Sequence, residues 1–161
     1  MIHVDLGLSR AEFSLKAQFE LPGSGVTGIF GQSGGGKTTL LRAIAGLEPG
    51  AVGSLSVNGR CWQSESIFLP AENRHIGLVF QEPSLFSHLD VRANLVFGSD
   101  RGKDRKKNNK APQAAVLEHI CTTLELGSLL HRDPRSLSGG EQQRVAIARA
   151  LARDIKVLLL D

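Results

Sequence analysis

Strand patterns occur near both ends of the chain. Apolar and polar residues alternate along residues 13–21 (FSLKAQFEL), which is typical of a strand with one buried and one exposed face. Three short apolar runs without alternation are also predicted to be strands, and the first of them is a candidate central strand of a sheet. They are residues 26–30 (VTGIF), 75–81 (HIGLVFQ) and 155–161 (IKVLLLD). Asn58-Gly59, between two alternating segments, predicts a β-hairpin turn.

Helical spacing of apolar residues predominates between these strands. Residues 38–47 (TTLLRAIAGL) have this spacing, and Gly46 is placed to end the helix. Further helices are predicted in residues 91–98 (VRANLVFG), 111–130 (APQAAVLEHICTTLELGSLL) and 137–154 (LSGGEQQRVAIARALARD). Strands that flank a helical segment predict an α/β fold with a mainly parallel core sheet, an N-terminal antiparallel β element and a helical subdomain.

The composition fits one soluble globular domain. The chain has 161 residues, of which 41% are hydrophobic and 22% charged, and no apolar run approaches the ~20 residues that span a membrane. Cys61 and Cys121 lie far apart without metal-ligand spacing, so we expect reduced thiols. The net charge is +3, and six of the nineteen basic residues lie in residues 101–110 (RGKDRKKNNK). This segment is interpreted either as a solvated linker or as a contact with nucleic acid or anionic lipid.

Residues 31–38 fit the phosphate-loop pattern of Gly, any four residues, Gly, Lys and Ser or Thr. Glycines leave backbone N–H groups free to converge on phosphate oxygens, and the start of the following helix adds its partial positive charge. Lys37 would place its ammonium group on the outer phosphates, and the Thr38 hydroxyl would be a ligand for Mg²⁺. The candidate nucleotide-binding residues are Gly31, Gln32, Ser33, Gly34, Gly35, Gly36, Lys37, Thr38 and Thr39.

A phosphate loop alone does not select between kinases, GTPases, motors and transport ATPases. The guanine-specifying tetrad Asn-Lys-x-Asp does not occur in the sequence, which argues against a GTPase. A small-molecule kinase would need a lid rich in Arg, for which Arg101 and Arg105 are the candidates. Another motif in the sequence is more specific than either of these features.

Residues 137–142 (LSGGEQ) resemble the signature motif of ABC-type ATPases. This resemblance implies that ATP is held between two subunits, with the signature motif of one subunit against the γ-phosphate held by the other. The residues of this chain that would make the contact are Ser138, Gly139, Gly140 and Glu141. Many family members have Gln where this chain has Glu141.

The same resemblance assigns two further residues. Gln81 follows an apolar strand and is similar to the Q-loop glutamine of the family, and Asp161 is similar to the Walker B aspartate. The implied catalytic residues are Lys37 and Gln81, and the implied metal ligands are Thr38, Gln81 and Asp161. The implied cofactors are therefore ATP and Mg²⁺.

Residues 68–98 (FLPAENRHIGLVFQEPSLFSHLDVRANLVFG) resemble the ATPase subunits of bacterial molybdate and related anion importers. The resemblance implies an energy-coupling subunit at the cytoplasmic face of the inner membrane that binds MgATP and, in full-length form, hydrolyses it. The implied partners are an integral membrane permease, a second ATPase subunit in a homodimer and, indirectly, an external substrate-binding protein; no nucleic acid is expected. Residues 82–89 (EPSLFSHL) are either the segment that docks on the permease or an ordinary exposed loop.

The resemblance extends over the whole chain and predicts three sections of one ATPase domain. Residues 1–81 would hold the β element and the phosphate-loop core, 82–136 the helical subdomain, and 137–161 the signature motif, its helix and the Walker B strand. Family members continue beyond the Walker B aspartate with a catalytic Glu and later a switch His. All five His precede Asp161, so we expect a truncated domain that lacks the C-terminal part of the fold and hydrolyses ATP poorly.

Two alternative functions stay open. One is a soluble ABC-type ATPase that acts on nucleic acid or ribosomes through residues 101–110, and the other is a remnant that only binds nucleotide. The residue that stacks on adenine is open as well. Phe13 is the nearest aromatic candidate, but its alternation with Leu15 and Ala17 suggests that it faces the core. The sequence does not identify the cargo or any C-terminal regulatory domain.

Overall fold

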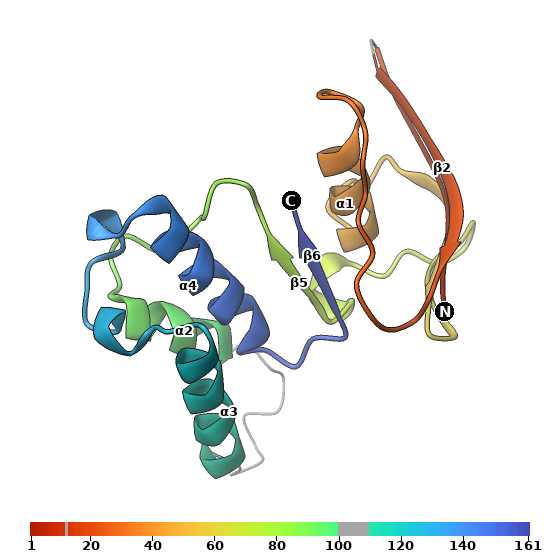
Figure 1. Ribbon diagram of the computed structural model, residues 1–161. Coiled ribbons are helices and arrows are strands. Elements are labelled where there is room, and N and C mark those ends of the chain that lie inside the picture. The colour runs from red at the N-terminus through yellow and green to blue at the C-terminus, as the bar shows by residue number, and fades with distance from the viewer. Residues whose placement is uncertain (12, 100–109) are drawn as a thin grey trace. The chain divides into compact units, whose positions relative to one another are not determined.

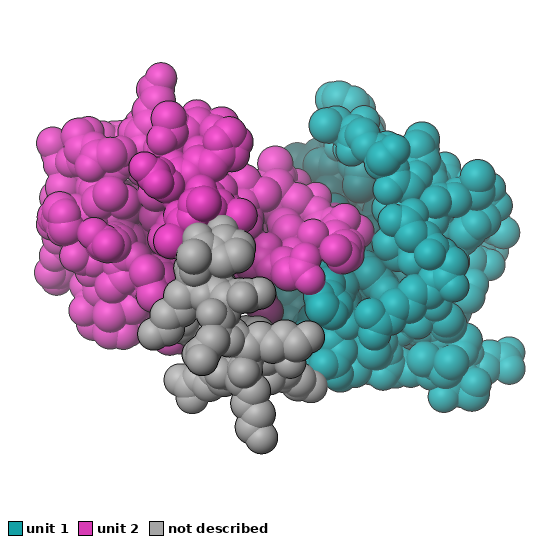
Figure 2. Space-filling model, turned by 90° about the horizontal axis from the view of Figure 1, so that it is seen from below, with its two compact units in different colours: residues 1–76, 161 teal, residues 77–160 magenta. Residues whose placement is uncertain are grey.

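The computed structural model describes residues 1–11, 13–99 and 110–161. The basic segment 101–110 therefore lies, except for its last residue, outside the described residues. The chain forms two compact units, residues 1–76 together with Asp161 and residues 77–160 (Figure 2). None of the helices in the described part of the chain is long and apolar enough to cross a membrane.

The first unit is built on a four-stranded antiparallel sheet with the strand order β2-β1-β3-β4 (Figure 1). Its strands are β1 (Ile2–Arg10), β2 (Phe13–Leu21), β3 (Val52–Val57) and β4 (Arg60–Gln63). The turn between β3 and β4 places Asn58 at φ 49° and Gly59 at φ 79°, the two positive values that a tight hairpin turn needs. The predicted antiparallel element, its alternating strand and its hairpin are therefore confirmed.

Helix α1 (Lys37–Ala45) follows the glycine-rich loop, as predicted. Gly46 ends it in the left-handed conformation, with φ 78°, and donates its N–H to the carbonyl of Ala43 at 3.0 Å. The fully buried guanidinium of Arg74 donates to the carbonyls of Ala43 and Ile44 at 3.1 and 2.7 Å. Two devices thus fix the C-terminal end of the helix whose other end carries the loop.

The prediction of a strand at residues 26–30 is wrong in this structure. The segment has no regular secondary structure, and Val26 and Phe30 are 102% and 95% exposed. A strand needs a neighbouring strand to pair its backbone N–H and C=O groups. None of the strands in the described residues pairs with this run, so its apolar composition does not produce a strand here.

The second unit combines a small sheet with three helices (Figure 1). Its elements are β5 (Ile76–Val79), α2 (Val91–Ser99), α3 (Lys110–Thr123), α4 (Gly139–Leu151) and β6 (Val157–Leu160). Strands β5 and β6 pair with each other and run in the same direction in Figure 1, which confirms the strands predicted around residues 75–81 and 155–161. Strand β5 ends two residues before Gln81. Short 3₁₀ turns occur at Gly127–Leu129 and Pro134–Ser136 in this unit, and at Ala71–Asn73 in the first unit.

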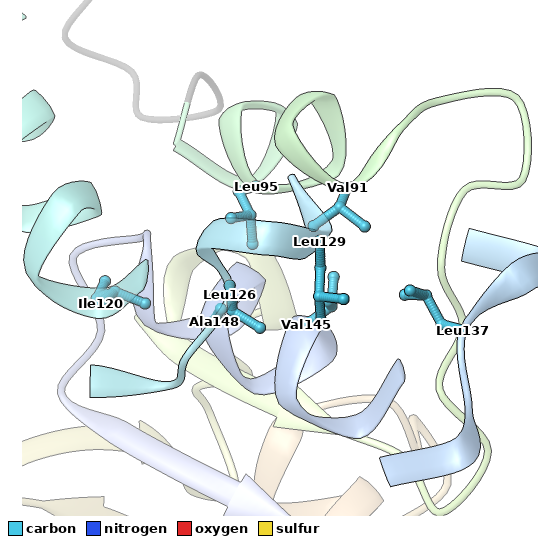
Figure 3. Close-up of a cluster of buried hydrophobic side chains, with 8 residues drawn as sticks. All are labelled: Val91, Leu95, Ile120, Leu126, Leu129, Leu137, Val145 and Ala148. Atoms are coloured by element: carbon cyan, nitrogen blue, oxygen red, sulfur yellow. The ribbon is translucent and has the colours of Figure 1, made fainter. Parts of the chain in front are cut away.

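The core of the second unit lies between its helices (Figure 3). It contains the buried residues Val91, Leu95, Ile120, Leu126, Leu129, Leu137, Val145 and Ala148. These residues come from all three helices and from the turns that follow α3. Because apolar burial is the main favourable term in folding, this cluster holds α2, α3 and α4 together.

The helix predicted over residues 111–130 is too long. Helix α3 ends at Thr123, and Glu125 has a left-handed φ of 54°. The N–H of Leu126 then donates to the carbonyl of Cys121 at 2.8 Å, and the Leu126 side chain is fully buried. The helical spacing continued into this turn because the turn also places an apolar residue in the core.

Candidate nucleotide-binding site

The glycine-rich loop has a backbone that only glycine adopts without strain at two positions. Gly34 and Gly36 have φ values of 76° and 84°. Gly36 also has no room for a side chain, since a Cβ would lie 2.9 Å from the ring of Phe13. The N–H of Gly35 donates to the carbonyl of Gln32 at 3.1 Å, which closes the loop. These glycines are thus required by the shape of the loop.

Lys37, the first residue of α1, folds back over this loop. Its ammonium group donates to the carbonyls of Gly31 and Gln32 at 3.0 and 2.8 Å. Helix α1 has no side-chain N-cap and no acidic residue in its first turn, so its first backbone N–H groups are not occupied by a carboxylate or hydroxyl. Loop, lysine and helix start together form a positive, solvent-facing cradle suited to phosphate.

Thr38 and Asp161, 123 residues apart in the sequence, meet beside this cradle. The Thr38 hydroxyl donates to Oδ1 of Asp161 at 2.7 Å. A hydroxyl and a carboxylate are both hard oxygen donors, the type that Mg²⁺ prefers. The donor set therefore fits the magnesium site expected from the sequence. No group of three or more His, Cys, Asp or Glu in the described residues offers an alternative metal site.

Phe13 lies against the glycine-rich loop. An added Cβ on Gly36 would meet the Phe13 ring and, at 3.3 Å, the side chain of Leu15. The two side chains thus point to the same face of β2, as their alternation predicted. Which residue, if any, stacks on adenine stays open.

In the second unit, the signature residues form the start of α4. Ser138 is the N-cap, and its backbone N–H and hydroxyl donate to Oε2 of Glu141 at 2.7 and 2.8 Å. The Glu141 N–H points back to the Ser138 hydroxyl at 3.4 Å, which completes a capping box. Both hydrogen bonds from Ser138 lower the pKa of Glu141, and the bond from the backbone N–H has the larger effect. Gly139 and Gly140 are exposed, and a Cβ on either would meet open space.

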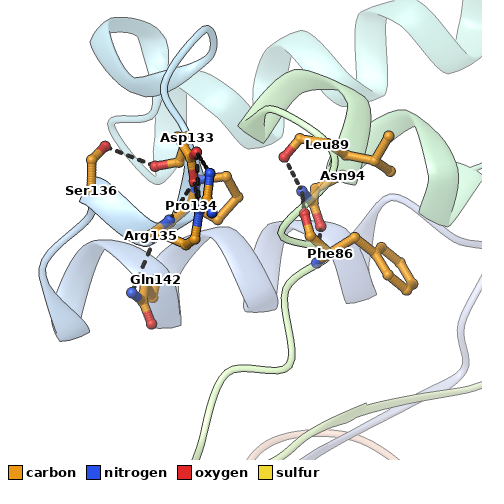
Figure 4. A network of polar contacts seen from close by, with 8 residues as sticks. All are labelled: Phe86, Leu89, Asn94, Asp133, Pro134, Arg135, Ser136 and Gln142. Atoms are coloured by element: carbon orange, nitrogen blue, oxygen red, sulfur yellow. Dashed lines mark hydrogen bonds and ion pairs between the residues drawn. The ribbon is translucent and has the colours of Figure 1, made fainter.

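The sequence did not identify the residues that support this helix start. The Gln142 amide donates to the carbonyl of Pro134 at 3.1 Å (Figure 4). It also donates to the carbonyl of Leu137 at 3.2 Å, and so fixes the segment before the signature. Hydrogen bonds from Arg135 lower the pKa of Asp133 to about 2; the guanidinium has the larger effect and the backbone N–H the smaller one. The only signal in the sequence was the position of Gln142 inside the motif.

Gln81 is exposed and lies in a bend beyond β5. The sequence also missed Asn94, a fully buried amide on α2 that binds the loop after Gln81. An Asn four residues after Asp90, at the start of a helix, was the available signal. The roles expected of Gln81 and of the signature residues stay predictions.

A comparison with known protein families decides the assignment. The family model described as ABC transporter matches residues 15–161. The chain belongs to the ABC transporter family. The resemblance seen in the LSGGEQ motif is thereby confirmed, and with it the α/β fold class. ABC ATPases bind ATP, typically with Mg²⁺.

Relatives of this ABC transporter family member carry the name molybdenum import ATP-binding protein ModC. The proteins of Thiobacillus denitrificans and Methylococcus capsulatus are 51% and 49% identical over 92% and 99% of the chain. The chain spans 40% and 43% of their lengths. Among solved structures, CbiO1 from Clostridium perfringens, part of the ABC transporter complex cbiONQ, has a TM-score of 0.73. It is 24% identical over 99% of this chain and 64% of that one, which establishes the fold alone.

Proposed function

We propose that the chain is the ATP-binding, energy-coupling part of a bacterial ABC importer whose cargo is molybdate or a related oxyanion. The observation that carries this proposal is the cradle of Lys37 and the Thr38–Asp161 pair in a chain about half identical to proteins named ModC. Full-length relatives extend well beyond the matched region, so hydrolysis of ATP is proposed for the whole protein.

The residues of the cradle would act on MgATP by position and charge. Lys37 would exchange its two loop carbonyls for phosphate oxygens, because an ammonium binds an anion more strongly than a neutral carbonyl. The oxygens of Thr38 and Asp161 would hold Mg²⁺, with Gln81 as a further ligand and catalytic residue. Mg²⁺, when bound, supplies charge neutralisation for the phosphate oxygens.

The signature residues would complete the site of a second copy of the protein. Gly139 and Gly140 have no side chains to obstruct an approaching phosphate, and Ser138 offers a hydroxyl. In the closed homodimer, Ser138–Glu141 of each subunit would face the ATP held by the other. Closure would be transmitted to an integral membrane permease through residues 82–89, and an external substrate-binding protein would deliver the cargo. The subunit would therefore sit on the cytoplasmic face of the inner membrane.

Titration of the full-length protein with MgATP tests the nucleotide site. Lys37→Ala is expected to weaken binding at least about tenfold, because it removes the charge from the cradle. Lys16→Ala, which removes an exposed lysine of β2, is the matched control and should leave the affinity unchanged. Equal affinity of wild type and Lys37→Ala would contradict the proposal.

Co-purification in mild detergent tests the importer assignment. We expect the full-length protein to be recovered with a membrane permease, and vesicles that contain both to take up molybdate when ATP is supplied. RNase-sensitive association with ribosomes, without a permease, would instead support the soluble ATPase. Nucleotide binding with neither partner would support the non-catalytic remnant.

A further inference from the structure

The segment between β5 and α2, residues 80–90, has neither helix nor strand, yet one side chain fixes its shape. Asn94 accepts the Phe86 N–H at 2.8 Å and donates to the carbonyls of Phe86 and Leu89, each at 3.1 Å (Figure 4). The same amide nitrogen lies 3.0 Å from the Asp90 carbonyl, so its two protons are shared among three carbonyl acceptors. Asn94 itself is fully buried, and its bonds hold the second half of the segment, residues 86–90, in one conformation.

The ring of Phe86 joins this segment to two helices of the same unit. It contacts Phe97 of α2 edge to face, with ring centroids 4.5 Å apart. The guanidinium of Arg149, in the last turn of α4, lies 5.0 Å from the centroid of the Phe86 ring. The Phe86 ring therefore links this segment to α2 and to the C-terminal end of α4.

Arg149 is an unusual residue to retain for stability alone. Burial lowers the pKa of its guanidinium. Its Nη1 atom is shielded from solvent and has no hydrogen-bond partner in the described residues. Arg149 as a whole is partly buried, and shielding one of its N–H groups without a hydrogen bond has a cost that an apolar residue of similar length would avoid. The Phe86 ring is the contact that offsets part of this cost.

We propose that Arg149 is a positioning residue that couples residues 82–89 to the signature motif. Helix α4 has 13 residues and spans roughly 20 Å. Its C-terminal end contacts Phe86 through Arg149, and its N-terminal end carries Ser138–Gly140. Movement of the docking segment by a permease shifts Phe86, and the contact with Arg149 passes that shift to α4 and the signature residues. This inference rests on the proposed function, because it needs a permease on residues 82–89.

The test uses the full-length ATPase, alone and reconstituted with its permease and binding protein in lipid vesicles, with molybdate as the cargo. Arg149→Met should leave the isolated ATPase within about twofold in kcat and KM. It should lower the kcat increment contributed by the permease about tenfold, the factor that a partly buried cation–π contact supports. Arg149→Lys, which keeps a cation over the ring, should retain most of that increment. Arg153→Met, at an exposed arginine just after α4, should leave both rates unchanged.

Phe86→Leu, alone and combined with Arg149→Met, completes a double-mutant cycle. If the two side chains act through one contact, the double variant loses no more of the permease-dependent increment than either single variant. Additive losses would overturn the proposal. An equal loss of kcat in the isolated and the reconstituted enzyme, together with a lower unfolding midpoint, would mark a structural role and would also overturn the proposal. The absence of any loss of kcat in either enzyme would overturn it as well.

The wild-type protein separates this inference from the proposed function. If it binds MgATP, associates with the permease and is stimulated by it, the outcomes above bear on Arg149 alone. If it does none of these, the proposed function fails, and the coupling role of Arg149 fails with it.

Discussion

Helices α1 and α4 both begin at glycine-rich segments expected to bind phosphate, but their first turns differ. Helix α1 starts from Gly36 in the left-handed conformation, with no side-chain cap and no acid in its first turn. Helix α4 starts from Ser138, whose N–H and hydroxyl donate to Glu141. The first helix start is open to an anion, whereas the second already holds a carboxylate of its own.

The difference shows that a glycine-rich motif does not by itself define an anion site. At α1 the glycines create the backbone shape, and Lys37 supplies the charge. At α4 the glycines only leave space, and a phosphate that binds Ser138 must replace hydrogen bonds to Glu141. A mutation should therefore affect binding and stability differently at the two helix starts.

Gly36→Ala should produce the largest effect. Its φ of 84° is strained for alanine, and its Cβ would lie 2.9 Å from the Phe13 ring. We expect the free energy of unfolding to fall by about 2–3 kcal/mol. We also expect the affinity for MgATP to fall at least about tenfold. Urea unfolding and calorimetric titration of the full-length protein measure the two quantities.

Gly140→Ala is the matched variant at α4. The added methyl group meets open space, and alanine favours a helix, so stability should rise by about 0.5–1 kcal/mol. Binding of ATP to the isolated subunit should not change, because in the proposed homodimer this residue would face the nucleotide of the partner. Equal destabilisation by both variants would contradict the inference that glycine sets the backbone shape at α1 but only leaves open space at α4.

Thr38→Val should have the next largest effect, confined to the magnesium-dependent part of binding. The variant keeps the shape of the side chain but loses the hydroxyl that donates to Asp161. We expect the gain in ATP affinity on adding Mg²⁺ to fall about tenfold, with affinity in EDTA unchanged. Thr122→Val removes a threonine hydroxyl on α3 that donates to Glu118 and should not alter either affinity. A full magnesium effect in Thr38→Val would exclude Thr38 as a ligand.

The sequence predicted the parts of the site that depend on local chemistry. The Gly and Lys pattern of residues 31–38 predicted a loop followed by a helix, and Asn58-Gly59 predicted the hairpin between β3 and β4. Both predictions were possible because each pattern specifies backbone geometry within a few residues. The meeting of Thr38 with Asp161 came only through family resemblance, since nothing local links residues 123 positions apart.

Non-local packing explains what the sequence did not give. The run at residues 26–30 has the composition of a strand. A strand also requires a neighbouring strand to pair with, and the sequence of this segment does not specify one. The predicted end of α3 was wrong for a similar reason, because Leu126 is buried in the core from a turn as fully as it would be from a helix. The sequence analysis assigned no role to Arg149, because its contact with Phe86 is visible only in three dimensions.

Glu141→Gln should have the smallest effect, and pH distinguishes it. Hydrogen bonds from Ser138 lower the folded-state pKa of Glu141 below its ordinary value of 4.5. The stabilisation is therefore complete above pH 4.5 and is lost as the pH falls through the lowered folded value. The difference in unfolding free energy between wild type and Glu141→Gln should shrink as the pH decreases from 6 to about 3. Ser138→Ala, which keeps the backbone N–H bond but not the hydroxyl, should retain part of this dependence. A difference independent of pH would mean that Glu141 does not act as a charged cap at the start of α4.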